Sequence, residues 1–246
     1  MRPRGVFTAS FVLMIASAAD AQAPAAAPQL IAVTHTAYSK TTELFAEWRP
    51  LIAGQATRLT AHLTHTGDHF KPYVDGKVTL TLSVEADTAN ATVDGPERPG
   101  VFRLNVTPAK AGTGRIAIDV VASAGAEHFV INNVPVYPTM QAALAAQRTV
   151  ETGLISYAKE RSWEEDFSTA PVGGVFQGAA RMFMVPSSAI VRDGAIAYVY
   201  VQRTPERFEL REVRTRRTIG DAIEIISGLR DGDRIVVRGA DKLPRK

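Results

Sequence analysis

The feature that most restricts the fold is a two-residue period of apolar side chains between residues 42 and 137. The clearest run has Thr or Ser at its intervening positions and consists of Val78, Leu80, Leu82 and Val84. Because successive side chains of a strand point to opposite faces of a sheet, this period predicts strands with one buried face. Similar runs, separated by turns rich in Gly, Asp and Pro, occupy residues 44–48, 59–63, 102–106, 116–120 and 129–131. Together they predict an antiparallel β-sandwich of immunoglobulin-like design over residues 30–137, in a mostly β protein.

A second β-rich region, residues 179–246, is predicted to form a small C-terminal β-domain. Two apolar runs, residues 189–191 and 195–201, flank the tripeptide Arg192-Asp193-Gly194. An Asp-Gly turn between two such runs is a strong local signal for a β-hairpin.

The last part of this region repeats the arrangement. Residues 223–226 and 235–237 flank a loop whose one large apolar residue is Leu229. We expect Leu229 to pack into the end of the small β-core. The apolar positions also change parity after Phe208, which predicts a β-bulge near residues 211–212.

Residues 138–178 connect the two β-rich regions and are predicted to form a short helical linker followed by a lead-in strand. Thr139 is a good N-cap for a helix over residues 140–147, which are rich in helix-forming residues. A second short helix is predicted over residues 153–163, from a set of side chains at helical spacing: Leu154, Tyr157, Ala158 and Arg161.

Residues 1–21 have the pattern of a secretory signal peptide. Arg2 and Arg4 precede an apolar stretch, and Ala19-Asp20-Ala21 has the form of a cleavage site. We therefore expect export by a cleaved signal peptide, with a disordered Ala- and Pro-rich tail at residues 22–29. The 246 residues contain no Cys, so the exported protein would be stabilised by its cores and not by disulfides.

Positive charge is concentrated in the C-terminal region. Residues 179–246 carry fourteen basic and nine acidic residues. A basic patch suits nucleic acid, an anionic surface or an acidic partner, and its ordinary alternative is a solvated strand face. Export makes nucleic acid an unsuitable partner, and we expect none.

Three stretches of the C-terminal region carry a family resemblance: V-P-S-S-A-I-V at residues 185–191, Y-V-Y-V at residues 198–201 and S-G-L-R-D-G-D-R-I-V at residues 227–236. They resemble the C-terminal, membrane-proximal domain of the periplasmic adaptors, or membrane fusion proteins, of resistance-nodulation-division (RND) efflux pumps. Residues 159–172 resemble the segment that, in adaptors of heavy-metal pumps, follows an extra N-terminal β-domain.

The resemblance implies a periplasmic, non-enzymatic protein peripheral to the inner membrane. Its implied partner is an inner-membrane RND transporter, and other adaptor chains are a further candidate. The family also has barrel, lipoyl-like and helical-hairpin domains between the two matching regions, where this chain has only residues 173–184. Twelve residues cannot hold a domain, so we do not expect the bridging functions of those domains from this chain.

The docking residues implied by the resemblance and by the charge lie at two turns and on one basic strand. They are Arg192, Asp193, Arg211, Arg214, Arg216, Arg217, Arg230 and Asp231.

The candidate metal ligands are His65, Asp68 and His69, with His62 on the preceding predicted strand. Imidazole and carboxylate groups suit Zn²⁺, Cu²⁺, Ni²⁺ and Co²⁺, so we expect at most a transient ion and no resident cofactor. The alternative is a set of exposed polar histidines, because the segment reads as a strand followed by a turn and His62 would point outward.

The sequence gives only weak signals for Cu(I) binding and for dinucleotide binding. Met182 and Met184 offer thioethers that suit Cu(I), although core packing is the commoner role of Met. Residues 112–117 match the loose dinucleotide fingerprint, but a strand and not a helix follows them. We therefore expect this protein not to be an enzyme.

Two alternatives to a docking subunit stay open: a small periplasmic metal-ion binding or chaperone module, and a truncated adaptor without function.

Overall fold

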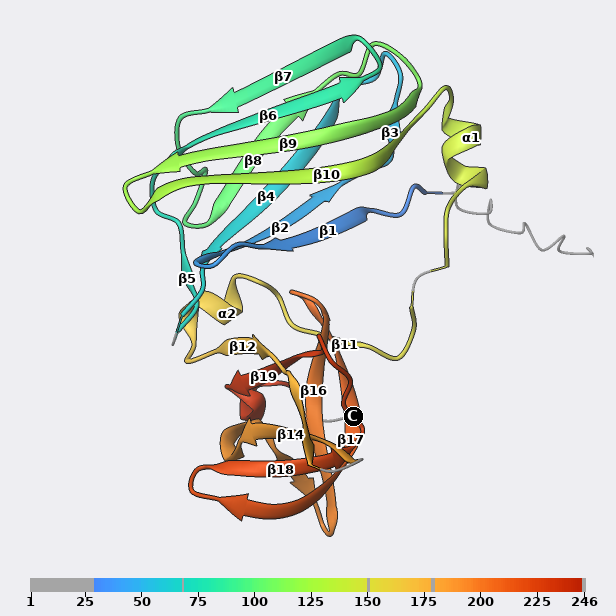
Figure 1. Ribbon diagram of the computed structural model, residues 1–246. Coiled ribbons are helices and arrows are strands. Elements are labelled where there is room, and N and C mark those ends of the chain that lie inside the picture. The colour runs from blue at the N-terminus through green and yellow to red at the C-terminus, as the bar shows by residue number, and fades with distance from the viewer. Residues whose placement is uncertain (1–28, 68, 150, 178–179, 245–246) are drawn as a thin grey trace, which may run out of the picture.

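The computed structural model describes residues 29–67, 69–149, 151–177 and 180–244. Figure 1 shows two β-rich parts, a sandwich above and a smaller C-terminal domain below, with a linker that descends along one side. The predicted signal peptide and most of the predicted tail lie outside the described residues. No helix in the described part of the chain is long and apolar enough to cross a membrane.

One sheet of the sandwich has the strand order β1-β2-β4-β5, and β8 also pairs with β4. Its strands, all antiparallel to their neighbours, are β1 (Val33–Tyr38), β2 (Thr42–Trp48), β4 (Thr57–His65), β5 (Lys71–Pro72) and β8 (Val101–Val106).

The other sheet has the order β3-β10-β9-β6-β7. Its strands are β3 (Leu51–Ile52), β6 (Lys77–Val84), β7 (Asp87–Val93), β9 (Gly112–Ala122) and β10 (Gly125–Tyr137). Its pairs are antiparallel, except that β3 runs parallel to β10. The apolar residues of the two-residue period meet between the sheets in one buried core, which confirms the predicted β-sandwich.

The linker begins with helix α1 (Met140–Ala145). Thr139 caps it, because its side-chain oxygen accepts a hydrogen bond from the Ala142 N–H at 3.2 Å. The first predicted helix is therefore confirmed.

The second predicted helix, residues 153–163, is wrong. Ile155 and Ser156 form strand β11, which pairs with the C-terminal domain, and only α2 (Arg161–Glu164) is helical. The buried side chains Ile155, Tyr157 and Lys159 alternate with exposed ones. The helical spacing was misleading because pairing with β17 and burial of alternate side chains favour an extended chain over a short helix.

The C-terminal domain is built on a nine-stranded sheet. Seven strands have the order β12-β19-β16-β17-β18-β14-β13, and the other two, β11 and β15, pair with β17 and β16. The strands not yet located are β12 (Ser168–Pro171), β13 (Gly174–Gln177), β14 (Ala180–Pro186), β15 (Val191–Asp193), β16 (Ile196–Thr204), β17 (Arg207–Ile219), β18 (Ala222–Ser227) and β19 (Arg234–Arg238). Two 3₁₀ turns complete it, η1 (Ser187–Ala189) and η2 (Ala240–Lys242).

Two local predictions in this domain are confirmed. Strands β15 and β16 form the expected hairpin, and Gly194 in its turn has φ +57°, a left-handed conformation that suits glycine. Leu229 is buried among the core side chains of the domain.

The predicted bulge at residues 211–212 is wrong. The β16–β17 register is regular there, and the irregularities of β17 lie at residues 214–218, where it pairs with β18. The change in apolar parity has another cause, because both faces of β17 are covered. Phe208 faces a core shared with the linker, and Val213 faces the domain's own core.

The sandwich, linker and C-terminal domain share this second core. Its buried members are Phe70 and Val101 from the sandwich, Ile155, Tyr157, Trp163 and Phe167 from the linker, and Val191, Tyr200, Phe208, Val236, Ala240 and Leu243 from the C-terminal domain. We call this shared core and the polar groups at its edge the junction.

The junction covers the outer face of β2 and β4. His62, expected to be exposed, is 4% exposed and lies between the rings of Phe45 and Trp163, with centroids 5.4 and 6.1 Å away. The indole Nε1–H of Trp163 donates to Thr64 Oγ1 at 2.9 Å. The polar face of β4 is therefore an internal surface against the linker and not a solvated one.

A buried ion pair lies in the junction. Lys159 Nζ contacts Glu43 Oε1, and the two side chains are 1% and 0% exposed. Tyr38 Oη donates to Glu43 Oε2 at 2.7 Å, and the Gln202 amide of β16 reaches the same oxygen at 3.5 Å. The Lys159 backbone N–H donates to Glu206 Oε1 at 2.9 Å, so both parts of the molecule contact this one residue of the linker.

Candidate functional site

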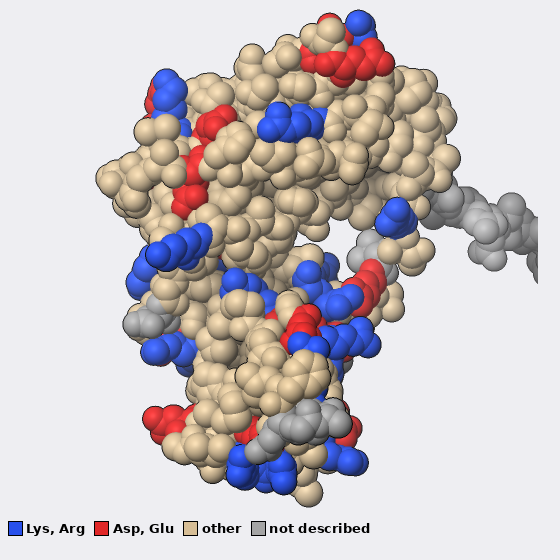
Figure 2. Space-filling model, in the orientation of Figure 1, with Lys and Arg blue, Asp and Glu red and all other residues tan. Residues whose placement is uncertain are grey.

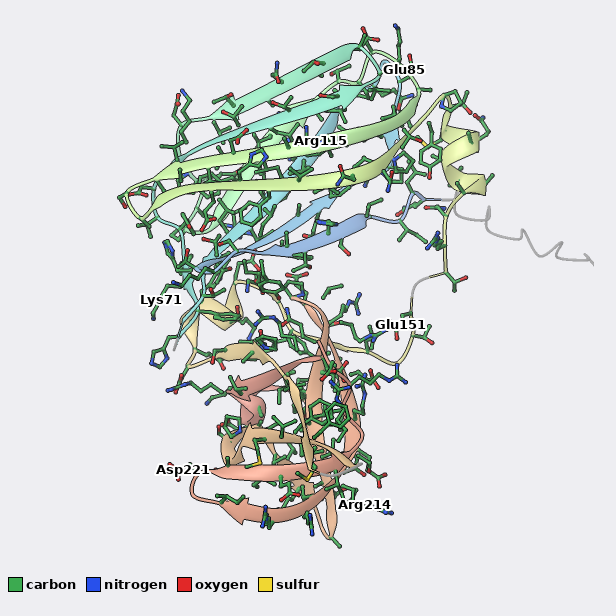
Figure 3. The ribbon with its side chains drawn as sticks, in the orientation of Figure 1. Lys71, Glu85, Arg115, Glu151, Arg214 and Asp221 are labelled. Carbon is green, nitrogen blue, oxygen red and sulfur yellow. The ribbon has the colours of Figure 1, made fainter. Side chains whose placement is uncertain are left out.

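Three of the predicted docking arginines are exposed and lie outside the ion pairs of the described residues. Arg192 lies on β15, Arg214 on β17 and Arg230 in the loop before β19. Figure 3 shows Arg214 at the outer side of the C-terminal domain. Within the described residues, none of the three guanidinium groups forms an ion pair. An unpaired guanidinium keeps its N–H donors available for an external carboxylate or phosphate.

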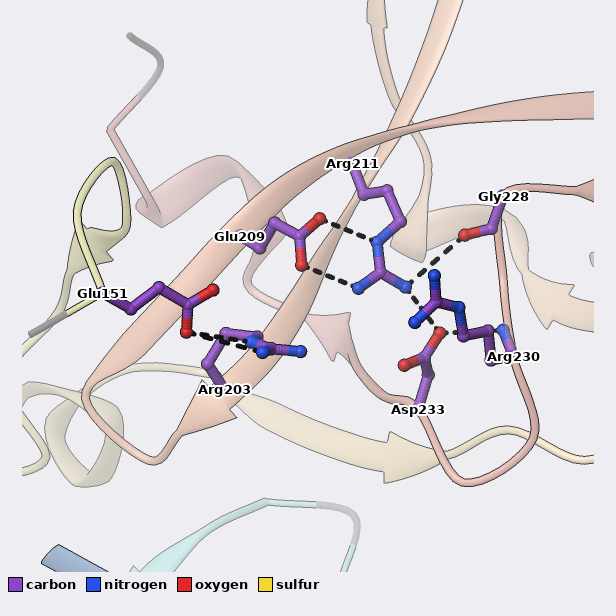
Figure 4. A network of polar contacts seen from close by, with 7 residues as sticks. All are labelled: Glu151, Arg203, Glu209, Arg211, Gly228, Arg230 and Asp233. Atoms are coloured by element: carbon purple, nitrogen blue, oxygen red, sulfur yellow. Dashed lines mark hydrogen bonds and ion pairs between the residues drawn. The ribbon is translucent and has the colours of Figure 1, made fainter. Parts of the chain in front are cut away.

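Arg211 is already paired within the domain (Figure 4). Its guanidinium contacts Glu209 Oε2 at 2.7 Å and Asp233 Oδ2 at 2.6 Å, and its side chain is 16% exposed. The hydrogen bond from Arg211 lowers the pKa of Glu209, and the reciprocal interaction raises the pKa of Arg211. Asp233 also accepts the Arg230 backbone N–H at 2.8 Å, so Arg211 stabilises the loop that presents Arg230.

Arg216 and Arg217 share a buried carboxylate. Glu224 on β18 is 1% exposed and contacts Arg216 Nη1 at 3.3 Å and Arg217 Nε at 2.6 Å. Both arginines remain more than half exposed, so they are held in place while they face solvent. Sequence reasoning missed Glu224. Its signal was an acidic residue inside the apolar run of residues 223–226.

The two predicted acidic docking residues differ in their surroundings. Asp231 pairs with Arg181 and accepts the Gly174 N–H at 2.8 Å, so it ties the β13–β14 hairpin to the loop before β19. Asp193 is exposed in the β15–β16 hairpin. The docking roles of all eight residues remain predictions.

The predicted metal ligands contact different neighbours. The His65 ring stacks on Tyr73 with centroids 3.7 Å apart, and His69 Nδ1 lies 2.7 Å from Asp166 Oδ1. Asp68 lies outside the described residues. Among the residues that are described, no group of three or more His, Asp or Glu side chains is arranged to hold a metal ion. Binding of an ion by this set remains a prediction.

The two candidate thioethers share one side of β14 but not one environment. Met182 is 7% exposed, whereas Met184 is 42% exposed. Met182 packs in the protein, as is usual for Met, and Met184 contributes to an exposed surface.

His65 should make the stability of the sandwich depend on pH. Burial lowers its pKa from the usual 6.5, an effect that Asp75 and Glu127 oppose. The unfolded chain then binds this proton more readily than the folded one, so the stability is present above pH 6.5 and is lost as the pH falls. His65→Phe keeps a ring on Tyr73 but cannot be protonated. We expect the wild type to lose more stability than this variant between about pH 7.5 and about pH 5 in urea unfolding. Parallel pH profiles for the two proteins would rule out this role.

The C-terminal domain is similar to a domain of a known protein family. Residues 182–242, from β14 to η2, match the family model described as the C-terminal permuted SH3 domain of RND membrane fusion proteins. Residues 182–242 are therefore similar to this domain, and we call them the permuted SH3 domain. The permuted SH3 domain carries every predicted docking residue, whereas the sandwich and the linker lie outside the matched range.

Two solved structures from Cupriavidus metallidurans are also similar to the chain. One contains the N-terminal metal-binding site and the membrane proximal domain of SilB from strain CH34, with 34% identity over 29% of this chain and 39% of that one, at a TM-score of 0.26. The other is ZneB, with 18% identity over 74% of this chain and 40% of that one, at a TM-score of 0.23. This chain thus spans about two fifths of each solved chain. The curated proteins include no match.

Proposed function

We propose that the chain is an adaptor-like subunit of a heavy-metal cation efflux system. In this proposal it works in the periplasm, at the periphery of the inner membrane, and docks to an inner-membrane RND transporter. The observation that supports it is the membrane fusion protein domain at residues 182–242. The heavy-metal branch rests on the resemblance of residues 159–172, and the metal ion is cargo and not a resident cofactor. No catalytic role is proposed.

The exposed arginines support the choice of docking surface. Arg192, Arg214 and Arg230 come from three separate segments of the permuted SH3 domain and have no carboxylate partner among the described residues. Figure 2 shows that Lys and Arg side chains also gather on the lower end of this domain. An acidic surface on a partner would be attracted to them and oriented by them.

The short β13–β14 hairpin occupies the place where the family resemblance implies the bridging domains, and so it limits the proposed function to docking. It joins the lead-in strand β12 directly to the permuted SH3 domain, where the family resemblance implies the bridging domains. We propose that the chain docks without bridging and that other adaptor chains supply the contact to the outer membrane.

Docking is tested by crosslinking in intact cell envelopes, purification through a tag, and mass spectrometry. We expect the wild type to recover an inner-membrane RND transporter. The triple variant Arg192→Glu, Arg214→Glu, Arg230→Glu should recover about tenfold less, because each reversal replaces an attraction with a repulsion. These three positions are preferred to Arg216 and Arg217, since a Glu there would lie against the buried Glu224.

The matched control reverses three exposed arginines of the sandwich, Arg49, Arg58 and Arg115, and should leave recovery unchanged. Equal recovery by both triple variants would show that the proposed surface does not dock. Folded, exported wild type that recovers no transporter would refute the proposed function itself.

A further inference from the structure

An exposed apolar face lies at the end of the C-terminal domain that is farthest from the sandwich. Strands β13, β14 and β18 and the end of β17 form it (Figure 1). Its large side chains are Val175, Met184, Ile219 and Ile226, which are 55%, 42%, 49% and 39% exposed. We call these four residues the distal face.

The strand register places these four residues on one side of the sheet, together with Met182 and Glu224, which are 7% and 1% exposed. Val175 pairs with Met182, two residues before Met184 on the same side of β14. Met184 pairs with Glu224, which is two residues from Ile226. At the other end of β18, Ala222 pairs with Ile219. Residues opposite one another in a sheet share a face, and so do residues two apart on one strand.

On β14 and β18, the opposite side is already buried. Phe183, Val185 and Ile225 point into the domain's own core. The four residues of the distal face therefore point outward and are partly exposed, and exposed apolar side chains gathered on one surface mark an interaction site.

Positive charge borders the distal face in a fixed position. Arg216 and Arg217 lie on β17 beside Ile219, and both are held by the buried carboxylate of Glu224. Two guanidinium groups share one carboxylate, so one positive charge is left uncompensated within this group.

The combination of apolar side chains and arginines limits the occupant. A second copy docked face to face would bring two arginine pairs together, and like charges repel across such an interface. An anionic lipid surface fits both parts, because it offers phosphates to the arginines and an acyl boundary to the apolar side chains.

We propose that the distal face binds the surface of an anionic membrane, with Val175, Met184, Ile219 and Ile226 inserted at the acyl boundary and Arg216 and Arg217 on lipid phosphates. This contact is distinct from docking through Arg192, Arg214 and Arg230. It would hold the chain on the bilayer beside its partner.

The test is cosedimentation of the full-length purified protein with vesicles that contain no protein. One set is an equal mixture of phosphatidylglycerol and phosphatidylcholine, and the other is phosphatidylcholine alone. We expect the wild type to bind the anionic vesicles at least about tenfold more tightly than the neutral ones. Ile219→Glu with Ile226→Glu should weaken binding to anionic vesicles by about tenfold or more, since it places charge at the apolar boundary.

The matched control is Val74→Glu with Val121→Glu, at two exposed apolar positions of the sandwich, and it should bind as the wild type does. Arg216→Gln with Arg217→Gln provides an independent variant, because Gln can still donate to Glu224, and it should remove most of the preference for anionic vesicles. All variants share the same N-terminal segment, so a difference between them reports on the distal face. Circular dichroism confirms that each variant is folded.

Three results would overturn the proposal: equal binding of the wild type to both vesicle types, no binding to either, or equal binding by the distal-face and control variants. An acidic protein as occupant predicts no binding to either vesicle type. Because the vesicles contain no transporter, failure here leaves the docking proposal standing, and failure of docking leaves this result unaffected.

Discussion

Lys159→Ala is expected to lower the free energy of unfolding by about 3–5 kcal/mol, because it leaves the carboxylate of Glu43 buried without its cation. Glu43 is fully buried, and Tyr38 and Gln202 together do not supply a positive charge. Burial lowers the pKa of Lys159, an effect that Glu43 opposes, so the pair is held at a cost in desolvation. Urea unfolding at neutral pH, followed by far-UV circular dichroism, measures the loss.

The matched control is the double variant Glu43→Gln with Lys159→Met, which removes both charges and keeps most of the volume. It should be clearly more stable than Lys159→Ala, since no unpaired charge remains buried. A double-mutant cycle with the two single variants then isolates the interaction between the partners. If Lys159→Ala cost less than about 1 kcal/mol, the pair would be acting as an exposed one, contrary to its burial.

Trp163→Ala is expected to cost about 3–5 kcal/mol, the usual range for loss of a large aromatic side chain from a core. The ring packs directly on Gly100, whose φ of +78° and lack of a Cβ make room for it. Its indole N–H also satisfies Thr64, and its ring covers His62. The loss should appear as a lower urea midpoint and as faster proteolysis of the linker, because Trp163 joins the linker to the sandwich.

Trp163→Phe separates the two contributions of this side chain. It keeps an aromatic ring against Gly100 but loses the hydrogen bond to Thr64, so we expect a smaller cost of about 1–2 kcal/mol. Trp48→Phe is a useful comparison, since Trp48 lies in the core between the two sheets, away from the junction. Equal linker proteolysis in the wild type and Trp163→Ala would contradict the role of Trp163 in holding the linker.

The sandwich could be predicted from the sequence because its strands and turns are decided by residues that are close together in the chain. Each of its main strands shows the two-residue period, as in Val78 to Val84, and each period ends in turn residues. The Thr139 cap and the Gly194 turn are likewise decided by residues next to them in the chain.

The junction could not be predicted because its contacts are distant in sequence. Glu43 and Lys159, or Thr64 and Trp163, have no pattern that links them in one sequence. His62 and Thr64 occupy the polar positions of an ordinary half-exposed strand. The neighbouring sequence therefore gives no sign that the linker buries them. The same covering on both sides made β17 look as if it contained a bulge at residues 211–212.

The candidate docking residues were predicted in part. Charge and turn position pointed to Arg192, Arg214 and Arg230, which are exposed. The same reasoning could not separate them from Arg211, whose partners Glu209 and Asp233 are set by the sheet register and a loop. Docking itself stays a prediction for all of them.

The junction also limits how this chain could have been assembled during evolution. A module that closes its own core can be exchanged between proteins, because cutting at its boundary exposes little apolar surface. Here Phe70 of the sandwich and Tyr200 of the C-terminal domain are buried in one cluster with Tyr157 and Phe167 of the linker. The permuted SH3 domain and the sandwich are therefore expected to be inherited as one unit with the intervening segment, and a recombination break within residues 155–167 would leave both pieces with exposed aromatic surface.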